Sequence, residues 1–297
     1  MSERTQRKRT APLVVSAVAL SLAIGALGRS GVAQAQAPAP AGGAQAAAVI
    51  DMTGTWVSVV TEDWRWRMVT PPKGDVSSVP VNAAARAVAD AWDPAKDTAD
   101  GNACKSYGAA GLSRVPGRIN IAWQDANTLK MDFDAGTQTR LLRFGDVQPP
   151  AGADAGWQGF SAAVWEPVGG ARGGGAGGGG FGGGGGAAAA PAAAPAQGGR
   201  GAAAGAPAVP QFRGGDLLVT TTKMKPGYVR KNGIPYSATA VMTEYWDRHR
   251  EPNGDEWLTV TTIVHDPTYF MQDFITSTHF KKEPNASKFA PKPCVAS

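Results

Sequence analysis

The residues with the clearest chemical potential lie in segment 62–67, Glu-Asp-Trp-Arg-Trp-Arg. If this stretch is extended, Trp64 and Trp66 share one side and Arg65 and Arg67 share the other. Two arginines could clamp a carboxylate or a phosphate, and two indoles could cover a flat apolar ligand. The alternative is that the tryptophans pack in the core while the arginines stay in water or pair with the preceding acids.

A second candidate binding segment is 223–237, which carries two lysines before Tyr228 and then Arg230 followed by Lys231. Its Pro-Gly and Asn-Gly pairs are turn signals, so we expect an exposed connection between strands. The cations could attract an anionic ligand or a membrane surface, although a solvated basic loop is the simpler interpretation. We add Tyr228, Arg230 and Tyr245 to the candidate ligand-binding residues.

If the protein is an enzyme, Glu244 and His279 are the candidate acid–base residues. Both lie in expected strands. A carboxylate and an imidazole aimed into one cavity could move protons on a bound ligand. The alternative for His279 is a structural residue with satisfied hydrogen bonds. The three histidines lie on separate segments without the spacing of metal ligands, and no nucleotide-binding fingerprint is present, so we expect no metal and no cofactor.

The N-terminus predicts export. Four basic residues precede an apolar run over 13–27, and two Ala-Gln-Ala sites end at Ala35 and Ala37. This is the organisation of a secretory signal peptide, here residues 1–37, and the run is shorter than the ~20 apolar residues of a membrane span. We therefore expect a periplasmic or secreted protein without a transmembrane segment once the signal is removed.

Removal of the signal also changes the charge. The full chain has 29 basic and 24 acidic residues. Residues 1–37 contain five of the basic residues and one of the acidic residues, so the mature chain keeps 24 basic and 23 acidic residues. A nearly neutral mature chain has no basic stripe for nucleic acid, so we expect no nucleic-acid partner. The two cysteines, Cys104 and Cys294, form an even number in an exported chain, which favours a disulfide over two free thiols.

Composition divides the chain. Residues 38–50 form an Ala/Pro/Gly-rich tether, and residues 169–210 are almost wholly Gly, Ala and Pro. Such segments cannot bury enough apolar surface to offset chain entropy, so we expect both to be disordered. The segments 51–168 and 211–297 are each too small for a closed sheet, and we interpret them as two parts of one domain.

The rest of the chain predicts an all-β fold. Apolar and polar residues alternate in about nine stretches separated by turn signals. The expected strands are 55–66, 119–123, 129–133, 137–144, 157–165, 216–224, 239–247, 256–265 and 274–281. One helix, over 83–91, is expected behind the N-cap Asn82. A meander of consecutive antiparallel strands with one or two short helices favours a closed barrel of 8–9 strands, with an open sandwich as the alternative.

Short motifs resemble known proteins. Gly54-Thr55-Trp56 at the first strand is similar to the Gly-x-Trp start of lipocalins and other calycins, and 256–281 resembles the end of bacterial lipocalin-like barrels. The segments 62–75 and 104–109 resemble an uncharacterised family of exported bacterial proteins. The calycin resemblance implies a cup-shaped barrel able to hold a small, largely apolar molecule.

These observations lead to one functional hypothesis and two alternatives. The leading hypothesis is an exported lipocalin-like protein that binds a small hydrophobic or amphipathic ligand in the barrel. The alternatives are a cofactor-independent lyase, hydratase or isomerase on the same barrel, and an envelope structural or interaction protein. An apolar cavity favours the first, convergence of Glu244 and His279 with an arginine favours the second, and a filled barrel favours the third.

Overall fold

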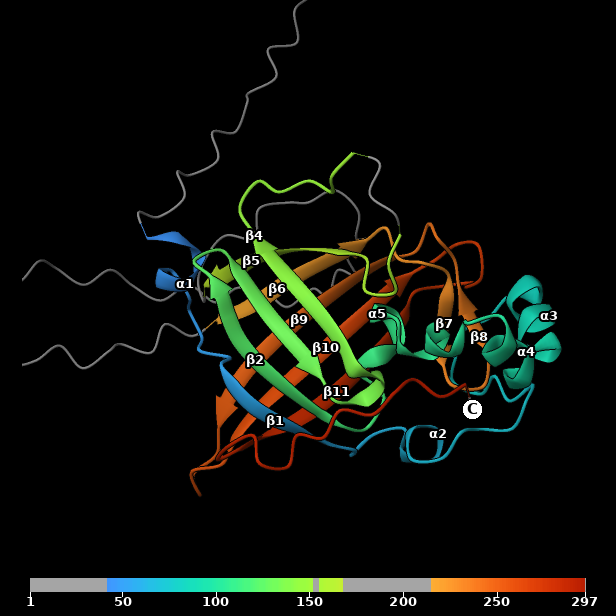
Figure 1. The fold of residues 1–297 in the computed structure, drawn as a ribbon, viewed down its shortest axis with the longest axis horizontal. Helices are drawn as coiled ribbons and strands as arrows, with labels where there is room; N and C mark the ends of the chain where they lie inside the picture. Colours follow the sequence, from blue (N-terminus) through green and yellow to red (C-terminus); the bar gives the residue numbers. More distant parts are fainter. Residues whose placement is uncertain (1–41, 152–154, 168–214, 297) are drawn as a thin grey trace, which may run out of the picture. The chain divides into compact units, whose positions relative to one another are not determined.

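The computed structural model describes residues 42–151, 155–167 and 215–296, and within them nine strands close into a barrel (Figure 1). Around the barrel the strands follow the order β1, β11, β10, β9, β6, β5, β4, β3, β2. The barrel strands are β1 (Gly54–Val59), β2 (Arg118–Asp125), β3 (Thr128–Phe133), β4 (Gln138–Phe144), β5 (Phe160–Pro167), β6 (Gly215–Thr222), β9 (Val241–Arg250), β10 (Glu256–His265) and β11 (Phe274–Glu283). The all-β barrel predicted from the sequence is confirmed.

The expected antiparallel meander needs one correction, at the pair β4–β5. Every other neighbouring pair in the barrel is antiparallel, but β5 runs parallel to β4, with Leu142 beside Ser161. A parallel neighbour requires the chain to return along the length of the strand before it pairs again. The barrel is therefore mixed.

Alternation along the strands fills the barrel interior. In β3 every second residue is buried, namely Leu129, Met131 and Phe133, as the period of two in a strand requires. Trp56 at the start of β1 is fully buried, and its indole Nε1 donates to the carbonyl of Met52 at 2.9 Å. The predicted inward faces of these strands therefore form one apolar core.

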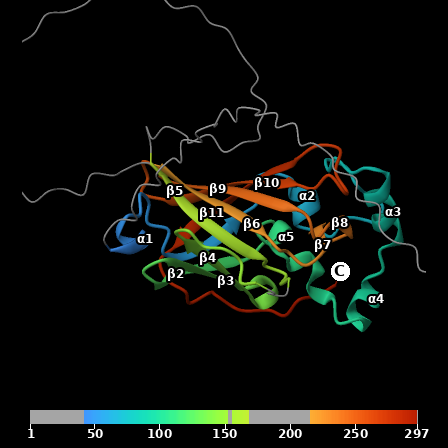
Figure 2. The same cartoon turned by 90° about the horizontal axis from the view of Figure 1, so that it is seen from above.

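Three connections, β1–β2, β3–β4 and β6–β9, contribute helices and strands to a cap at one end of the barrel. Figures 1 and 2 show α3 and α4 beside the hairpin β7–β8 at this end. The hairpin belongs to the β6–β9 connection and packs against α3, α5 and the 3-10 helix η1 of the β1–β2 connection. The cap elements are α2 (Trp64–Arg67), α3 (Ala83–Ala91), α4 (Pro94–Ala99), η1 (Ala103–Tyr107), α5 (Ala109–Leu112), η2 (Ala135–Thr137), β7 (Gly227–Arg230) and β8 (Ile234–Tyr236).

Helix α3 has the predicted bounds, and Asn82 caps it by accepting a hydrogen bond from the amide of Ala85 at 3.0 Å. The described residues contain more helix than expected, because the β1–β2 connection folds into several single-turn helices. The cap has a core of its own, in which Ala85, Ile234 and Phe270 are among the buried residues. No helix among the described residues is long and apolar enough to cross a membrane.

Two expected segments differ in the structure. The described part of the expected tether, 42–50, is not free: it contains α1 (Gly43–Ala46), whose Ala44 carbonyl accepts from the indole of Trp165 at 2.9 Å. Val49 and Ile50 are buried in the barrel core, because the end of the segment is apolar. The expected exposed connection 223–237 is instead a hairpin in which every residue of β7 and β8 is buried.

The disulfide between Cys104 and Cys294 is confirmed. It joins η1 in the cap to the C-terminal segment, which leaves β11 and returns along the barrel toward the cap (Figure 1). The predicted signal peptide, 1–37, and the predicted insertion, 169–210, lie outside the described residues.

The insertion interrupts a hairpin of adjacent strands, since Pro167 at the end of β5 pairs with Gly215 at the start of β6. Replacing residues 169–210 by a short Gly/Ser loop should therefore keep the free energy of unfolding equal or raise it by ~1–2 kcal/mol, because each halving of a loop gains only ~0.6 kcal/mol. Urea unfolding of the two proteins measures this difference. If the replacement lowered the free energy of unfolding by more than ~2 kcal/mol, residues 169–210 would stabilise the fold.

Candidate functional site

The candidate segment 62–67 is not extended as expected. β1 ends at Val59, and Asp63 takes a left-handed backbone conformation (φ 51°) that leads into the helical turn α2. The turn reverses the expected exposure, since the Trp64 side chain is 67% exposed and Arg67 is buried. Arg65 is exposed and Trp66 is half-buried. The two arginines therefore do not share one face.

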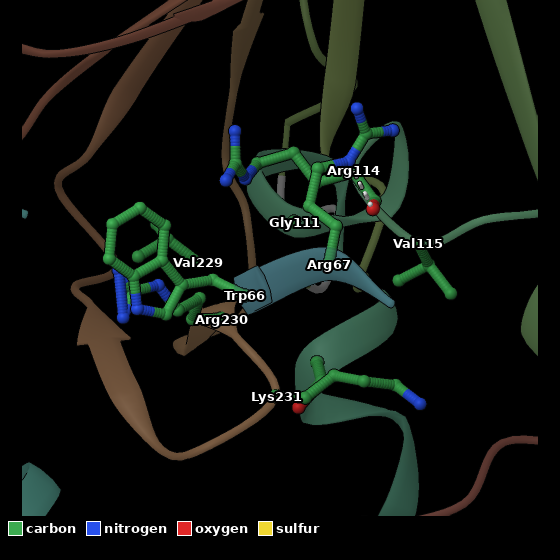
Figure 3. Close-up of a pocket in the computed structure, with 9 residues that line it drawn as sticks. Trp66, Arg67, Gly111, Arg114, Val115, Val229, Arg230 and Lys231 are labelled. Atoms are coloured by element: carbon green, nitrogen blue, oxygen red, sulfur yellow. Dashed lines mark hydrogen bonds between the residues drawn. The ribbon is translucent and has the colours of Figure 1, made fainter. Parts of the chain in front are cut away.

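Arg67 instead joins two arginines from other connections. Arg114 follows α5, and Arg230 ends β7. The exposed fractions of Arg67, Arg114 and Arg230 are 6%, 7% and 4%. Figure 3 shows Arg67 and Arg114 together above α2, with Arg230 beside Trp66. We call these three residues the arginine cluster.

Two members of the cluster have carboxylate partners. A guanidinium nitrogen of Arg67 pairs with Glu62, and its Nε donates to the Arg114 carbonyl at 3.0 Å, the dashed line in Figure 3. Arg114 Nη2 donates to Asp63 Oδ2 at 2.9 Å. Both acids directly precede α2, so the acidic pair noted in the sequence fixes two of the buried arginines.

Arg230 has only neutral acceptors among the described residues. It donates to the carbonyls of Asp75 and Ser77 and to the hydroxyl of Ser78. Its guanidinium lies 5.1 Å from the ring centre of Trp66, at a distance where the ring face attracts a cation. Burial, and then the positive charge of Arg114, lower the pKa of Arg230 to about 10. Arg230 stays protonated at neutral pH, and the nearby carboxylates of Asp75 and Asp63 act against these two effects.

The arginine cluster surrounds a cavity of about 20 Å³, lined also by Trp66 and Lys231. One buried nitrogen in each guanidinium has no hydrogen-bond partner in the described structure: Nη2 of Arg67, Nη1 of Arg114 and Nε of Arg230. Burial is also the largest cause that lowers the pKa of Arg67. Unsatisfied buried donors on charged groups are costly, and an acceptor in the cavity would remove that cost.

Glu62 connects the arginine cluster to His279. Its Oε2 lies 2.9 Å from His279 Nδ1, while its other oxygen pairs with Arg67. His279 is half-buried on the outer face of β11, where the hydroxyl of Thr61 also contacts it at 3.0 Å. His279 thus contributes to the network around Arg67.

The structure does not bring Glu244 and His279 together. Glu244 points into the barrel from β9 and forms a two-pronged ion pair with Arg140 of β4, at 3.0 and 2.6 Å. Neither Arg140 nor Glu244 has an exposed side chain. The convergence of Glu244 and His279 that would favour the enzyme alternative does not occur, because the two side chains lie on opposite faces of the barrel wall.

The two candidate tyrosines lie elsewhere. Tyr228 is buried in the cap, where its hydroxyl donates to Asp97 Oδ2 at 2.8 Å and Lys105 lies above its ring. Burial, and then the hydrogen bond to Asp97, raise the pKa of Tyr228. Tyr245 lies on the outer face of β9 and does not line the arginine cavity.

The described residues contain no group of three or more His, Cys, Asp or Glu side chains that could hold a metal ion. No family model, no curated protein and no solved structure matches this chain. The closed barrel is consistent with the lipocalin-like architecture expected from the sequence, but no comparison assigns the chain to that family.

Proposed function

We propose that this protein is an exported binding protein that holds the anionic group of a small molecule in the arginine cluster. The observation that carries this proposal is the set of three buried guanidinium groups, each with an unpartnered nitrogen, around one cavity. A cavity of about 20 Å³ admits roughly one water-sized group. It therefore suits a halide or one end of a carboxylate better than a whole phosphate.

A water molecule of that size could accept hydrogen bonds but could not offset charge. The cluster holds three guanidinium groups against two directly paired carboxylates, those of Glu62 and Asp63. Charge-assisted hydrogen bonds from arginine to an anion are about twice as strong as neutral ones. These stronger hydrogen bonds favour an anion over water, although Asp75 also acts electrostatically on Arg230.

We place the ligand at the cap, not in the barrel, because the protein's own side chains occupy the barrel interior. Trp56, Trp246, Leu258 and the Arg140–Glu244 pair are each no more than 1% exposed. Export follows from the predicted signal peptide, and the Cys104–Cys294 disulfide is typical of oxidising compartments. We propose no reaction, since Glu244 and His279 do not converge.

Acetate should bind the oxidised protein in a saturable 1:1 manner and raise its melting temperature, as any ligand of the native state does. Arg114→Gln should weaken acetate binding at least tenfold, which corresponds to ~1.4 kcal/mol, because it removes one of the charged donors. Isothermal titration calorimetry and thermal unfolding at constant ionic strength measure both effects.

The matched control is Arg65→Gln, which removes an exposed guanidinium from the same helical turn and should leave acetate binding unchanged. Arg114→Lys keeps the charge and should bind acetate with intermediate affinity. Equal acetate affinity in the wild type and in a folded Arg114→Gln variant would remove the arginine cluster from consideration as an anion site.

A further inference from the structure

A larger cavity of about 640 Å³ adjoins the arginine cluster. Both cavities are lined by Val115 and Lys231, and the chain runs directly from Arg114 in the first to Arg118 in the second. We call the larger cavity the tail groove, because Lys292, Pro293 and Val295 of the C-terminal segment line it. Its volume falls in the range of small-molecule sites, roughly 300–1,000 Å³.

The tail groove has a mixed lining, in which apolar side chains stand beside the charged residues Arg118, Asp134, Lys231 and Lys292. Val57 of β1, Val115, Ala135 of η2 and Val295 of the tail contribute apolar surface. The side chain of Val295 is 53% exposed although it faces this cavity. An apolar molecule in the groove would cover surface that now faces water, which is favourable in proportion to the area removed.

The tail wall is held in place by three connections. The amide of Lys292 donates to the carbonyl of Asp134 at 2.8 Å, and the hydroxyl of Thr137 donates to the carbonyl of Lys292 at 2.9 Å. The third connection is the disulfide of Cys294 to Cys104 in the cap. The groove in this form therefore depends on the disulfide, since a free terminal segment frays unless it is tied down.

We infer that the ligand is an amphipathic carboxylate whose head lies in the arginine cluster and whose apolar body lies in the tail groove. This inference rests on the proposed function and adds the chemical class of the ligand. Val115 and Lys231 line both cavities, which places the head site and the tail groove next to each other. The disulfide-tethered tail then sets the affinity for the body and leaves the head site unchanged.

The test is a series of straight-chain ligands, acetate, butanoate, hexanoate and octanoate, with octanol as the uncharged comparison. Calorimetric titration of the oxidised protein should show Kd falling with chain length, by at most about fourfold per methylene when each is fully buried. Octanol should bind at least tenfold more weakly than octanoate, because it leaves the guanidinium groups uncompensated.

Val295→Asp should weaken octanoate binding at least tenfold and change acetate binding less than twofold, since it places a negative charge on the groove wall only. The matched control is Val164→Asp, on the outside of β5, because Val164 is equally exposed at 53%. That variant should leave both affinities unchanged. The exposure of both valines makes either substitution tolerable for folding.

Carboxylate binding by a variant whose C-terminal segment is no longer tied down by the disulfide gives an independent second test. The Cys104→Ser/Cys294→Ser variant should bind acetate with wild-type affinity. Its affinity should no longer increase from acetate to octanoate. Should it fail to fold, the valine variants decide. Acetate binding without any gain from longer chains would overturn the tail groove but leave the arginine cluster as an anion site, whereas no binding of any carboxylate would reject the proposed function itself.

Discussion

Loss of the Cys104–Cys294 disulfide should lower the free energy of unfolding by up to about 5 kcal/mol. The bond joins two residues that are 190 positions apart in the sequence. It therefore closes a loop of 191 residues, counting both ends (294 − 104 + 1). The chain-entropy relation gives about 5 kcal/mol for that length, as an upper value because residual structure in the unfolded chain reduces it. Every barrel strand except β1 lies within this loop. The loss would be comparable to the whole stability of a modest domain.

Urea unfolding of the oxidised protein and of a Cys104→Ala/Cys294→Ala variant measures the difference. Alanine leaves no unpaired thiol and fits the half-buried position of Cys294. The protein that keeps its disulfide but lacks residues 169–210 is a useful control, because the entropic account predicts a slightly smaller effect for its shorter loop. A loss below ~1 kcal/mol would show that the tail contributes little to folding.

The strands could be predicted because each carries its own signal. β10 has the predicted bounds, Glu256–His265, and its buried residues alternate as the pattern requires. Burial of one face with a period of two is a local property of a strand on a closed sheet. The parallel pairing of β4 and β5 was missed, because partner choice depends on the path of a connection and not on the residues of either strand.

The arginine site was only half predictable. The segment 62–67 was selected for its tryptophans and arginines, and their alternation suggested a strand. In the structure the acids bind the buried guanidinium groups of Arg67 and Arg114, and this fixes a helical turn that no local period shows. Arg230 was selected from a turn-rich basic segment, yet it is buried, because the hairpin packs under the cap helices.

Arg114 and Arg140 carried no signal that the sequence could reveal. Arg114 lies 51 residues from Asp63, and Arg140 lies 104 residues from Glu244. A single arginine in a loop or a strand is usually solvated, and only the closed fold brings each one to its partner. Glu244 drew attention for its inward position, which the structure confirms, but its partner is an arginine and not the imidazole expected.

The Arg140–Glu244 pair lies in a polar layer between the two apolar cores. Along β9, Met242 belongs to the cap core and Trp246 to the barrel core, with Glu244 between them. Thr221 of β6 extends the layer, since its hydroxyl accepts from Arg140 at 3.3 Å and contacts Ser161 of β5 at 2.8 Å. The ion pair and its hydroxyl neighbours thus connect four strands through the interior.

Arg140→Met should therefore destabilise the protein by about 3–5 kcal/mol, because it leaves the Glu244 carboxylate buried without its cation. The double variant Arg140→Met/Glu244→Leu should recover most of that loss, since an apolar pair of similar volume needs no desolvation of charge. Urea unfolding of the wild type, both single variants and the double variant gives the coupling energy directly.

The exposed pair Lys96–Asp100 provides the contrast. Its side chains are 71% and 46% exposed, and the same cycle there should give a coupling below about 0.5 kcal/mol. The recovered double variant should still bind acetate with wild-type affinity, because the arginine cluster shares no residue with the polar layer. Loss of acetate binding in that stably folded variant would indicate that acetate binds in the barrel and not in the arginine cluster. A double variant as unstable as Arg140→Met would instead mean that the polar layer itself is needed to join the two cores.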